Sequence, residues 1–262
     1  MLRKDDKIMA SKKYDVIGEE RFNNFGSKMK IIDCRGHTDI DIYFEEYNYI
    51  VKHKRYERFK NGSIECPYEP RHCGIGYIGE GKYSHKTHKK IYNEWIHMLK
   101  RCYSEKVKNK YPTYIGCSVD KEWHNFQNFA KWYEENYYEI KGQRMELDKD
   151  ILYKGNKIYS SSNCIFVPQR INSLLINCKS TRGDLPIGVT YHNNKFYVRC
   201  SILDGNKRKR VSLGYYNTIE EAFQTYKNFK EKYIKEVAEE YKDLIPNRLY
   251  RALYEYKIEI ND

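Results

Sequence analysis

The sequence lacks long runs of apolar residues. No stretch approaches the roughly 20 consecutive apolar residues that a membrane-spanning helix needs, and residues 1–6 are mostly polar. We therefore expect no signal peptide, no membrane segment and no membrane partner. The protein is expected to be soluble and to act in the cytoplasm.

Closely paired cysteines are also missing. The eight cysteines are scattered through apolar and aromatic stretches, without a Cys-x-x-Cys pair. This distribution is typical of buried free thiols in a reducing compartment. A zinc site drawn from Cys102, Cys117 and His124 is conceivable, but its spacing matches none of the common zinc patterns. Free thiols are therefore the favoured interpretation.

The sequence contains no convincing dinucleotide-binding unit, although residues 74–79 read Gly-x-Gly-x-x-Gly. That fingerprint has meaning only between the strand and the helix of a βαβ unit. Here Pro67 and Pro70 precede it and a polar stretch follows it. We interpret residues 74–90 as a linker.

Positive charge and tyrosine are abundant. The 262 residues include 48 Lys or Arg against 36 Asp or Glu, which gives a formal net charge of +12, and 27 tyrosines. The excess of positive charge predicts a polyanionic partner. Tyrosine can stack on a base and also form hydrogen bonds, so its abundance favours nucleic acid as that partner.

The pattern along the chain predicts an α+β protein built from several small domains. Residues 1–20 are charged and thinly apolar, and they predict a mobile arm or a loosely attached first strand. Short β-branched and aromatic runs, separated by turn residues, fill residues 21–73 and predict a small SH3-like β-barrel. Its basic residues either contact DNA or form only a solvated face.

Residues 91–178 combine two kinds of pattern. Helical spacing of apolar residues from Lys90 to Cys102, and again over residues 121–138, predicts two helices. From residue 145 to residue 175 the sequence changes to an acidic strand end, a polar loop, a second apolar strand and a short helix that begins near Pro168. This order predicts a compact ββα unit.

The ββα segment resembles the ββα-metal, or HNH, nucleases, in particular the homing endonucleases of phages. The phrases Trp-x-x-Met-Leu-x-Arg-Cys-Tyr from Trp95 and Glu-Trp-x-x-Phe-x-x-Phe from Glu122 are similar to the lead-in of phage HNH-like units. The resemblance therefore covers residues 95–175. It implies that a divalent cation, Mg²⁺ or Mn²⁺, assists the hydrolysis of a DNA phosphodiester.

The same resemblance assigns roles to four residues. It implies that Asp148 and Asn172 bind the cation, that Asn163 braces the loop, and that Lys149 stands where the family has its general-base histidine. A carboxylate and an amide oxygen suit a hard cation, and they leave coordination positions for phosphate oxygens. Asp148 and Lys149 could instead form only a surface ion pair at a strand end.

Lys149 departs from the family pattern. A lysine of ordinary pKa is protonated at neutral pH and cannot accept a proton from water. Either burial depresses its pKa, or another group acts as the base, or the protein binds DNA without cutting it. His97 and His124 are candidate substitute bases, although a lone helical histidine is more often structural.

Residues 186–241 predict three antiparallel strands joined by tight hairpins, followed by a helix from about residue 219. Thr218 is the expected N-cap of this helix, with Glu221 completing a capping box. The segment resembles the ethylene-response-factor-type DNA-binding domain, for example in Lys195-Phe-Tyr-Val-Arg. Residues 242–262 read as a tail with a short helix and no evident chemistry.

The resemblance implies that the three-stranded sheet lies in the major groove of double-stranded DNA. Side chains spaced by two along each strand would then reach bases and phosphates from one face. Alternatively, the face is only a solvated surface. The candidate DNA-binding residues are Tyr191, Lys195, Tyr197, Arg199, Lys207, Arg208 and Arg210.

Together these patterns predict an N-terminal SH3-like barrel, a central helical and ββα-metal unit, and a C-terminal three-stranded antiparallel sheet packed on a helix. The first hypothesis is a monomeric, metal-dependent DNA endonuclease acting in a phage-infected bacterium. The second is a non-cleaving DNA-binding regulator or phage counter-defence protein on a degenerate nuclease scaffold. A third is a protein-interaction role for the N-terminal barrel.

Overall fold

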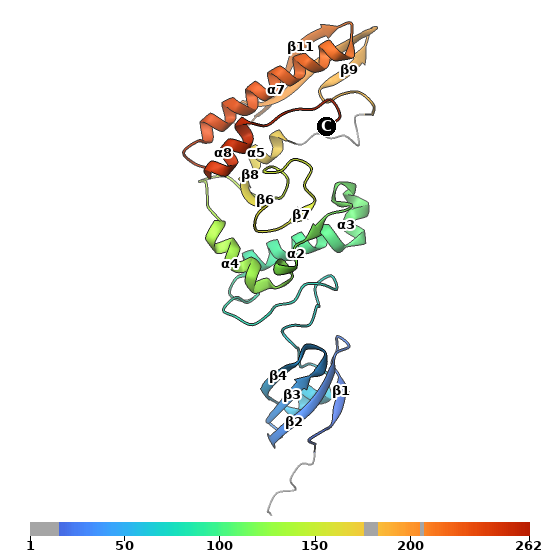
Figure 1. The fold of residues 1–262 in the computed structure, drawn as a ribbon, viewed down its shortest axis with the longest axis vertical. Helices are drawn as coiled ribbons and strands as arrows, with labels where there is room; N and C mark the ends of the chain where they lie inside the picture. The colour runs from blue at the N-terminus through green and yellow to red at the C-terminus, as the bar shows by residue number, and fades with distance from the viewer. Residues whose placement is uncertain (1–15, 176–182, 205–206) are drawn as a thin grey trace, which may run out of the picture. The chain divides into compact units, whose positions relative to one another are not determined.

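The computed structural model describes residues 16–175, 183–204 and 207–262 (Figure 1). The protein is α+β, as predicted, with 36% helix and 26% strand. The chain divides into two compact units. The first consists of Met1–Ile115 and Val119–Lys131, and the second of Gly116–Ser118 and Trp132–Asp262. No helix in the described ranges is long and apolar enough to cross a membrane.

The first unit begins with a four-stranded antiparallel sheet in the order β1-β2-β3-β4. One face of the sheet is buried, because apolar residues alternate along β2 and β3 and meet Phe59 and Ile64 in a common core. The elements are β1 (Glu20–Phe22), β2 (Lys28–Gly36), β3 (Asp39–Phe44), the 3-10 helix η1 (Glu45–Tyr47), β4 (Tyr49–Lys54) and α1 (Tyr56–Lys60).

The predicted closed barrel is not found in this part of the chain, which is described from residue 16 onward. Closure would require pairing between β1 and β4, but these strands are the two edges of an open sheet. After β4 the chain enters α1, and the fully buried Phe59 covers the core there instead. Residues 1–15 of the predicted arm lie outside the described residues.

The helical part of the first unit follows the predicted linker. α2 buries Ile91, Trp95, Met98, Leu99 and Cys102 on one face, which confirms the predicted helical spacing. The indole Nε1 of Trp95 donates a hydrogen bond to the carbonyl oxygen of Trp123 at 2.7 Å. The elements are α2 (Lys89–Tyr103), α3 (Glu105–Lys110), η2 (Pro112–Tyr114), η3 (Lys121–His124) and α4 (Phe126–Asn136), whose last residues belong to the second unit.

The second unit contains the strand, loop, strand and helix order expected between residues 145 and 175. β6 (Met145–Asp148) pairs antiparallel with β8 (Ile165–Pro168), and α5 (Gln169–Leu174) follows β8 directly, with Pro168 as its N-cap. Two short strands, β5 (Ser118–Val119) and β7 (Ile158–Tyr159), form a second small ladder.

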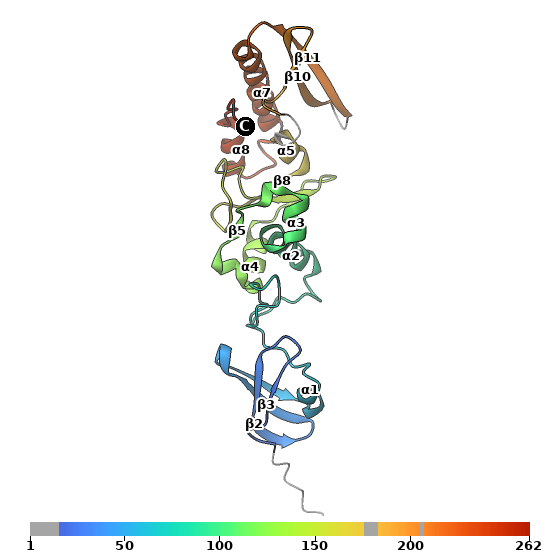
Figure 2. The ribbon, with the colours of Figure 1, turned by 90° about the vertical axis from the view of Figure 1, so that its right-hand side faces the viewer.

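The C-terminal part of the second unit is a three-stranded antiparallel sheet, in the order β11-β10-β9, with a long helix along it (Figure 2). The side chain of Thr218 accepts a hydrogen bond from the backbone N–H of Glu221 at 3.3 Å, so the predicted N-cap is confirmed. The elements are β9 (Val189–His192), β10 (Lys195–Asp204), β11 (Lys207–Tyr216), α7 (Ile219–Tyr241) and α8 (Asn247–Tyr254).

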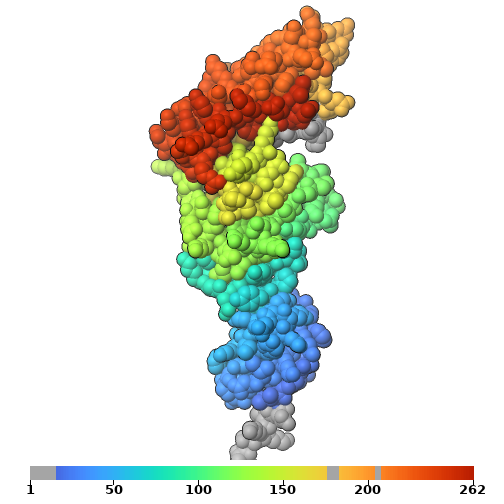
Figure 3. All heavy atoms as spheres, in the orientation of Figure 1, coloured from blue at the N-terminus to red at the C-terminus, as the bar shows by residue number. Residues whose placement is uncertain are grey.

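The ββα segment and the C-terminal sheet share one hydrophobic core. Val167 and Ile171 belong to the same buried cluster as Val198 of β10 and Ile234 of α7. The C-terminal residues lie against α7 in Figure 3 and contribute Leu253 and Ile258 to this core, although the sequence predicted no role for them. Each such fully buried side chain stabilises the fold by about 1.5–3 kcal/mol, so α5 and the sheet are held together by apolar burial.

Candidate functional site

Asp148 stands at the end of β6, where the chain turns into the loop. Its Oδ1 accepts hydrogen bonds from the backbone N–H groups of Asp150, at 2.9 Å, and Ile151, at 2.7 Å. Burial, together with the negative charge of Asp150, raises the pKa of the Asp148 carboxyl to about 6, although the two backbone bonds favour the ionised form. At neutral pH the group is therefore mainly a carboxylate, with Oδ2 free of hydrogen bonds within the described residues.

Lys149 is buried, with 7% of its surface exposed. Its ammonium donates a hydrogen bond to Oδ2 of Asp150 at 3.1 Å and lies 5.9 Å from the centre of the Tyr159 ring. Burial, the largest single effect, lowers the pKa of Lys149. The charge and hydrogen bond of Asp150, together with the charges of Cys117 and Asp148, outweigh burial, so the pKa is raised above the ordinary value. A depressed pKa is therefore not the explanation for lysine at this position, and the ion pair it forms is with Asp150.

Asn163 forms hydrogen bonds to the loop between β6 and β8. Its Nδ2 donates to Oδ1 of Asn156 at 3.2 Å and to the carbonyl oxygen of Ile158 at 3.4 Å. Asn156 in turn donates through Nδ2 to the carbonyl oxygens of Lys149, at 2.7 Å, and Ile158, at 2.8 Å. The brace is thus a pair of asparagines, and the sequence reasoning missed Asn156, whose only signal is its place in the turn after Gly155.

Asn172 lies on α5, and its amide faces β6. Its Nδ2 donates a short hydrogen bond to Oε2 of Glu146. Glu146 precedes Asp148 by two residues on β6, so both side chains project from the same face of the strand. No hydrogen bond joins Asp148 directly to Asn172 in the described chain, and Glu146 was not among the predicted site residues.

The C-terminal tail reaches the loop that follows Asp148. The ammonium of Lys154 donates to Oδ2 of Asp262 at 2.6 Å and to the carbonyl oxygen of Lys257 at 2.8 Å, and it lies 5.3 Å from the Tyr256 ring centre. Burial raises the pKa of Tyr256 to about 12, aided by the charges of Asp262, Asp150 and Asp148. Tyr256 therefore keeps its hydroxyl proton at neutral pH, and these contacts hold the tail against the loop.

Neither the alternative zinc site nor the substitute bases gain support. Among the described residues, only Asp39, Asp41 and His53 form a group of three metal-ligating side chains. The guanidinium of Arg35 already bonds both carboxylates of that group, at 2.8 and 2.6 Å. Nε2 of His124 lies 3.1 Å from the carbonyl oxygen of Val119, which fits a structural role. The described cysteines are free thiols, as predicted.

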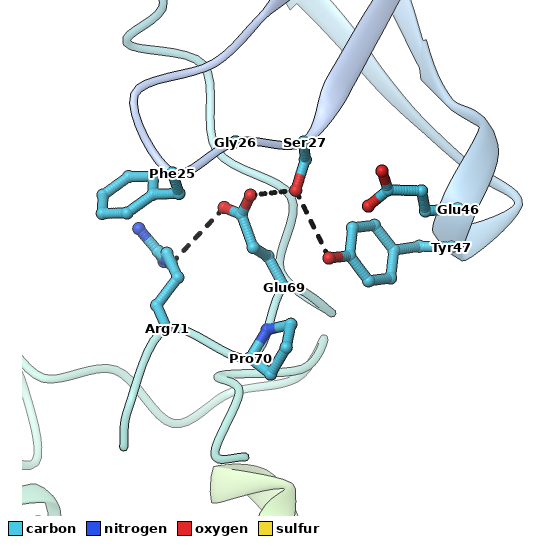
Figure 4. Close-up of a pocket in the computed structure, with 8 residues that line it drawn as sticks. All are labelled: Phe25, Gly26, Ser27, Glu46, Tyr47, Glu69, Pro70 and Arg71. Carbon is cyan, nitrogen blue, oxygen red and sulfur yellow. Dashed lines mark hydrogen bonds and ion pairs between the residues drawn. The ribbon is translucent and has the colours of Figure 1, made fainter. Parts of the chain in front are cut away.

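The first unit contains a cavity of about 360 Å³ beside β2 (Figure 4). The buried carboxylate of Glu69 accepts hydrogen bonds there from Asn23, at 2.9 Å, and from the hydroxyl of Ser27. The guanidinium of Arg71 lies 4.8 Å from the ring centre of Phe25 and 3.8 Å from Glu69. The Glu69 carboxylate is thus paired, whereas the buried Nε of Arg71 has no hydrogen-bond partner among the described residues. The cavity contains none of the predicted site residues.

One face of the C-terminal sheet carries cations and aromatic rings. The register pairs Tyr197 with Tyr215, Ser201 with Arg210, and Leu203 with Arg208. Residues directly opposite each other in antiparallel strands share a face. The alternate residues Val198 and Cys200 are buried toward α7. The predicted residues that share the exposed face are therefore Lys195, Tyr197, Arg199, Arg208 and Arg210.

Tyr191 does not lie on that face, which corrects the prediction. The turn between β9 and β10 consists of Asn193 and Asn194, both with positive φ, so Tyr191 pairs with Phe196, with ring centres 5.1 Å apart. Phe196 packs against the core on the α7 side. Thr190, opposite Tyr197, takes the position expected of Tyr191. The side chain of Lys207 and the hairpin tip at residues 205–206 lie outside the described residues.

The charge of the exposed face is uncompensated. Within the described chain, Lys195, Arg199, Arg208 and Arg210 are exposed and form no ion pair. Residues 186–216 contain six Lys or Arg and one acidic residue. Tyr197 and Tyr215 stack beside these cations, with ring centres 4.7 Å apart. Cations and stacked aromatic rings on one flat face can bind phosphates and base edges.

No protein-family model, curated protein or solved structure matches the chain. The assignment of a function therefore rests on the chain's own residues. Two features of the second unit bear on it: the oxygen-bearing side chains at the end of β6 and on α5, and the cationic sheet face that shares their core.

Proposed function

We propose that the protein is a DNA-binding endonuclease of HNH type, which hydrolyses a DNA phosphodiester with one divalent cation, Mg²⁺ or Mn²⁺. The observation that carries the proposal is the joining of two parts in a single core. One part places a carboxylate at the end of β6 and an amide on the helix that follows β8, and the other presents a cationic, aromatic sheet face. A protein that binds DNA and hydrolyses its phosphodiester needs both parts, the oxygen ligands and the cationic sheet face.

Asp148 and Asn172 are the residues that would hold the cation. The free Oδ2 of Asp148 and the carbonyl oxygen of Asn172 are hard oxygen ligands, which Mg²⁺ and Mn²⁺ prefer. When bound, the cation would polarise the scissile phosphate and stabilise the departing oxygen. The pair of asparagines, Asn163 and Asn156, keeps the loop between the two strands in place through the backbone of Lys149.

The contribution of Lys149 is positive charge. Because its pKa is raised, it keeps its proton at neutral pH, neutralises Asp150 and cannot accept a proton from water. The proton of the attacking water would then leave to solvent or to a phosphate oxygen. We expect slow cleavage, since positioned general-base catalysis contributes about 10²–10⁴-fold to rates.

The exposed face of β10 and β11 would bind double-stranded DNA in the major groove, with arginines reaching guanine edges and lysines the phosphates. We expect this activity in the cytoplasm of a phage-infected bacterium, with the protein acting as a monomer. Binding by this face does not depend on cleavage.

A second function is favoured by the same lysine. A protonated Lys149 that is paired with Asp150 fits a DNA-binding regulator or phage counter-defence protein on a degenerate nuclease scaffold. The two functions predict the same DNA affinity. They differ only in whether the phosphodiester is cut.

The test is incubation of the purified protein with a supercoiled plasmid library and Mg²⁺ or Mn²⁺, with and without EDTA. Nicked or linear products that appear only with the cation support the endonuclease. Retarded plasmid that remains supercoiled, across a library wide enough to contain the recognition site, overturns the endonuclease in favour of the regulator. Products that persist in EDTA contradict a cation-dependent site.

A further inference from the structure

We infer that Glu146 is a positioning residue for the proposed metal site. It fixes the orientation of the Asn172 amide, so that the carbonyl oxygen of Asn172 faces the cation. This inference rests on the proposed function. Its structural basis is the short hydrogen bond from Nδ2 of Asn172 to Oε2 of Glu146.

The fold brings these two side chains together from separate elements. Glu146 and Asp148 lie on one face of β6, while Leu147 between them is 6% exposed and points to the other face. α5 begins immediately after β8, the partner of β6. Ile171 and Leu174 are buried at 0% and 5%, which fixes the rotation of α5 about its axis and turns Asn172 toward Glu146.

The chemistry of the bond determines which end of the amide faces Glu146. A carboxylate only accepts hydrogen bonds, so it pairs with the NH₂ arm of Asn172 and not with the carbonyl arm. The carbonyl oxygen must then lie on the side of the amide away from that bond. Without Glu146 the amide could turn over and present its NH₂ group, which cannot bind a cation.

Glu146 also lies near an exposed cation. Its Oε1 lies 3.8 Å from Nε of Arg144, and its side chain is 24% exposed. Among the described residues, no group of three His, Cys, Asp or Glu side chains that could hold a metal includes Glu146. Its hydrogen bond to the Asn172 amide gives Glu146 the place of an outer partner, of the kind that orients the ligands of known metal sites.

The test measures Mn²⁺ affinity by electron paramagnetic resonance of the free ion, without DNA or turnover. Wild type, Glu146→Gln and Asp148→Asn are compared, with Glu236→Gln on α7 as the control for loss of one carboxylate. Glu146→Gln keeps the size of the side chain but can donate as well as accept, so Asn172 is no longer oriented. We expect a 10–100-fold loss of affinity, the typical effect of removing such a partner.

A rescue variant separates orientation from a merely structural role. In the double variant Glu146→Gln with Asn172→Asp, both oxygens of the new carboxylate are equivalent, so no orientation is needed. We expect this variant to bind Mn²⁺ at least as tightly as wild type. If it instead binds as weakly as Glu146→Gln alone, the inference is overturned, and thermal melts of both variants show whether folding is affected.

The outcomes distinguish this inference from the proposed function. If wild type binds no Mn²⁺, or Asp148→Asn binds it as well as wild type, the proposed metal site fails and the inference fails with it. If Asp148→Asn loses affinity while Glu146→Gln binds like wild type, only the role of Glu146 is overturned. Loss in Glu146→Gln together with recovery in the double variant supports both.

Discussion

Removing cations from the exposed sheet face should reduce the salt dependence of DNA binding. Lys195, Arg199, Arg208 and Arg210 are the described cations that share this face without an ion pair. If each neutralises one phosphate, the slope of log K against log salt is about −3.6, at about −0.9 per contact. Affinity would then fall about 150-fold between about 50 and 200 mM salt. The combined Arg208→Ala and Arg210→Ala variant should lower the slope by about half.

The assay is fluorescence anisotropy of a labelled duplex over that range of salt. The matched control is Lys232→Ala, because Lys232 is an exposed cation on α7 that is already 3.9 Å from Glu236. This control changes the net charge as a single arginine substitution does but leaves the sheet face intact. Equal slopes for Arg208→Ala and Lys232→Ala would refute the reasoning, since net charge rather than this face would then govern binding.

Three further predictions concern the stability of the fold. Burial lowers the pKa of Lys230, which has no ion pair among the described residues, so Lys230→Met should raise the melting temperature. The difference in melting temperature between Lys230→Met and wild type should shrink as pH rises toward 10.5, because the wild-type lysine then loses its charge in both the folded and the unfolded state. Thermal melts at two pH values check this. Gly188→Ala should destabilise by about 1–3 kcal/mol more than Gly183→Ala in urea denaturation, because only at Gly188 would the new Cβ meet Tyr226, at 2.0 Å. In the metal-free folded protein the pKa of Asp148 is about 6, above the value of 3.8 in the unfolded chain. The contribution of this carboxyl to the free energy of unfolding should therefore fall as pH rises from 3.8 to about 6. Thermal melts of wild type and Asp148→Asn across this pH range test the direction of the change.

Local signals predicted the C-terminal sheet and helix well. Tight turns, alternating strands and the cap at Thr218 depend on neighbouring residues, so they can be read from sequence. Tyr191 was misplaced because the two-residue turn, Asn193 and Asn194, pairs it with Phe196, whose side chain faces the core. A shift of one residue in register moves a side chain to the other face of a sheet.

Long-range features could not be read in the same way. Whether β1 and β4 pair depends on contacts between distant residues, and the open sheet differs from the predicted barrel for that reason. The hydrogen bond between Asn172 and Glu146 also joins different elements, α5 and β6. The hydrogen bond between Lys154 and Asp262 of the tail joins residues more than 100 positions apart, and no local sequence pattern indicates it.

The central claim is that Asp148 serves chemistry rather than folding or DNA binding. The most direct measurement is plasmid nicking with Mn²⁺ by wild type, Asp148→Ala and Asp243→Ala, each with its DNA affinity measured in parallel. Asp243 is an exposed aspartate of the same unit and is the matched control. We expect Asp148→Ala to lose nicking and keep its affinity, with Asp243→Ala unchanged. Nicking by Asp148→Ala at the wild-type rate would contradict the account.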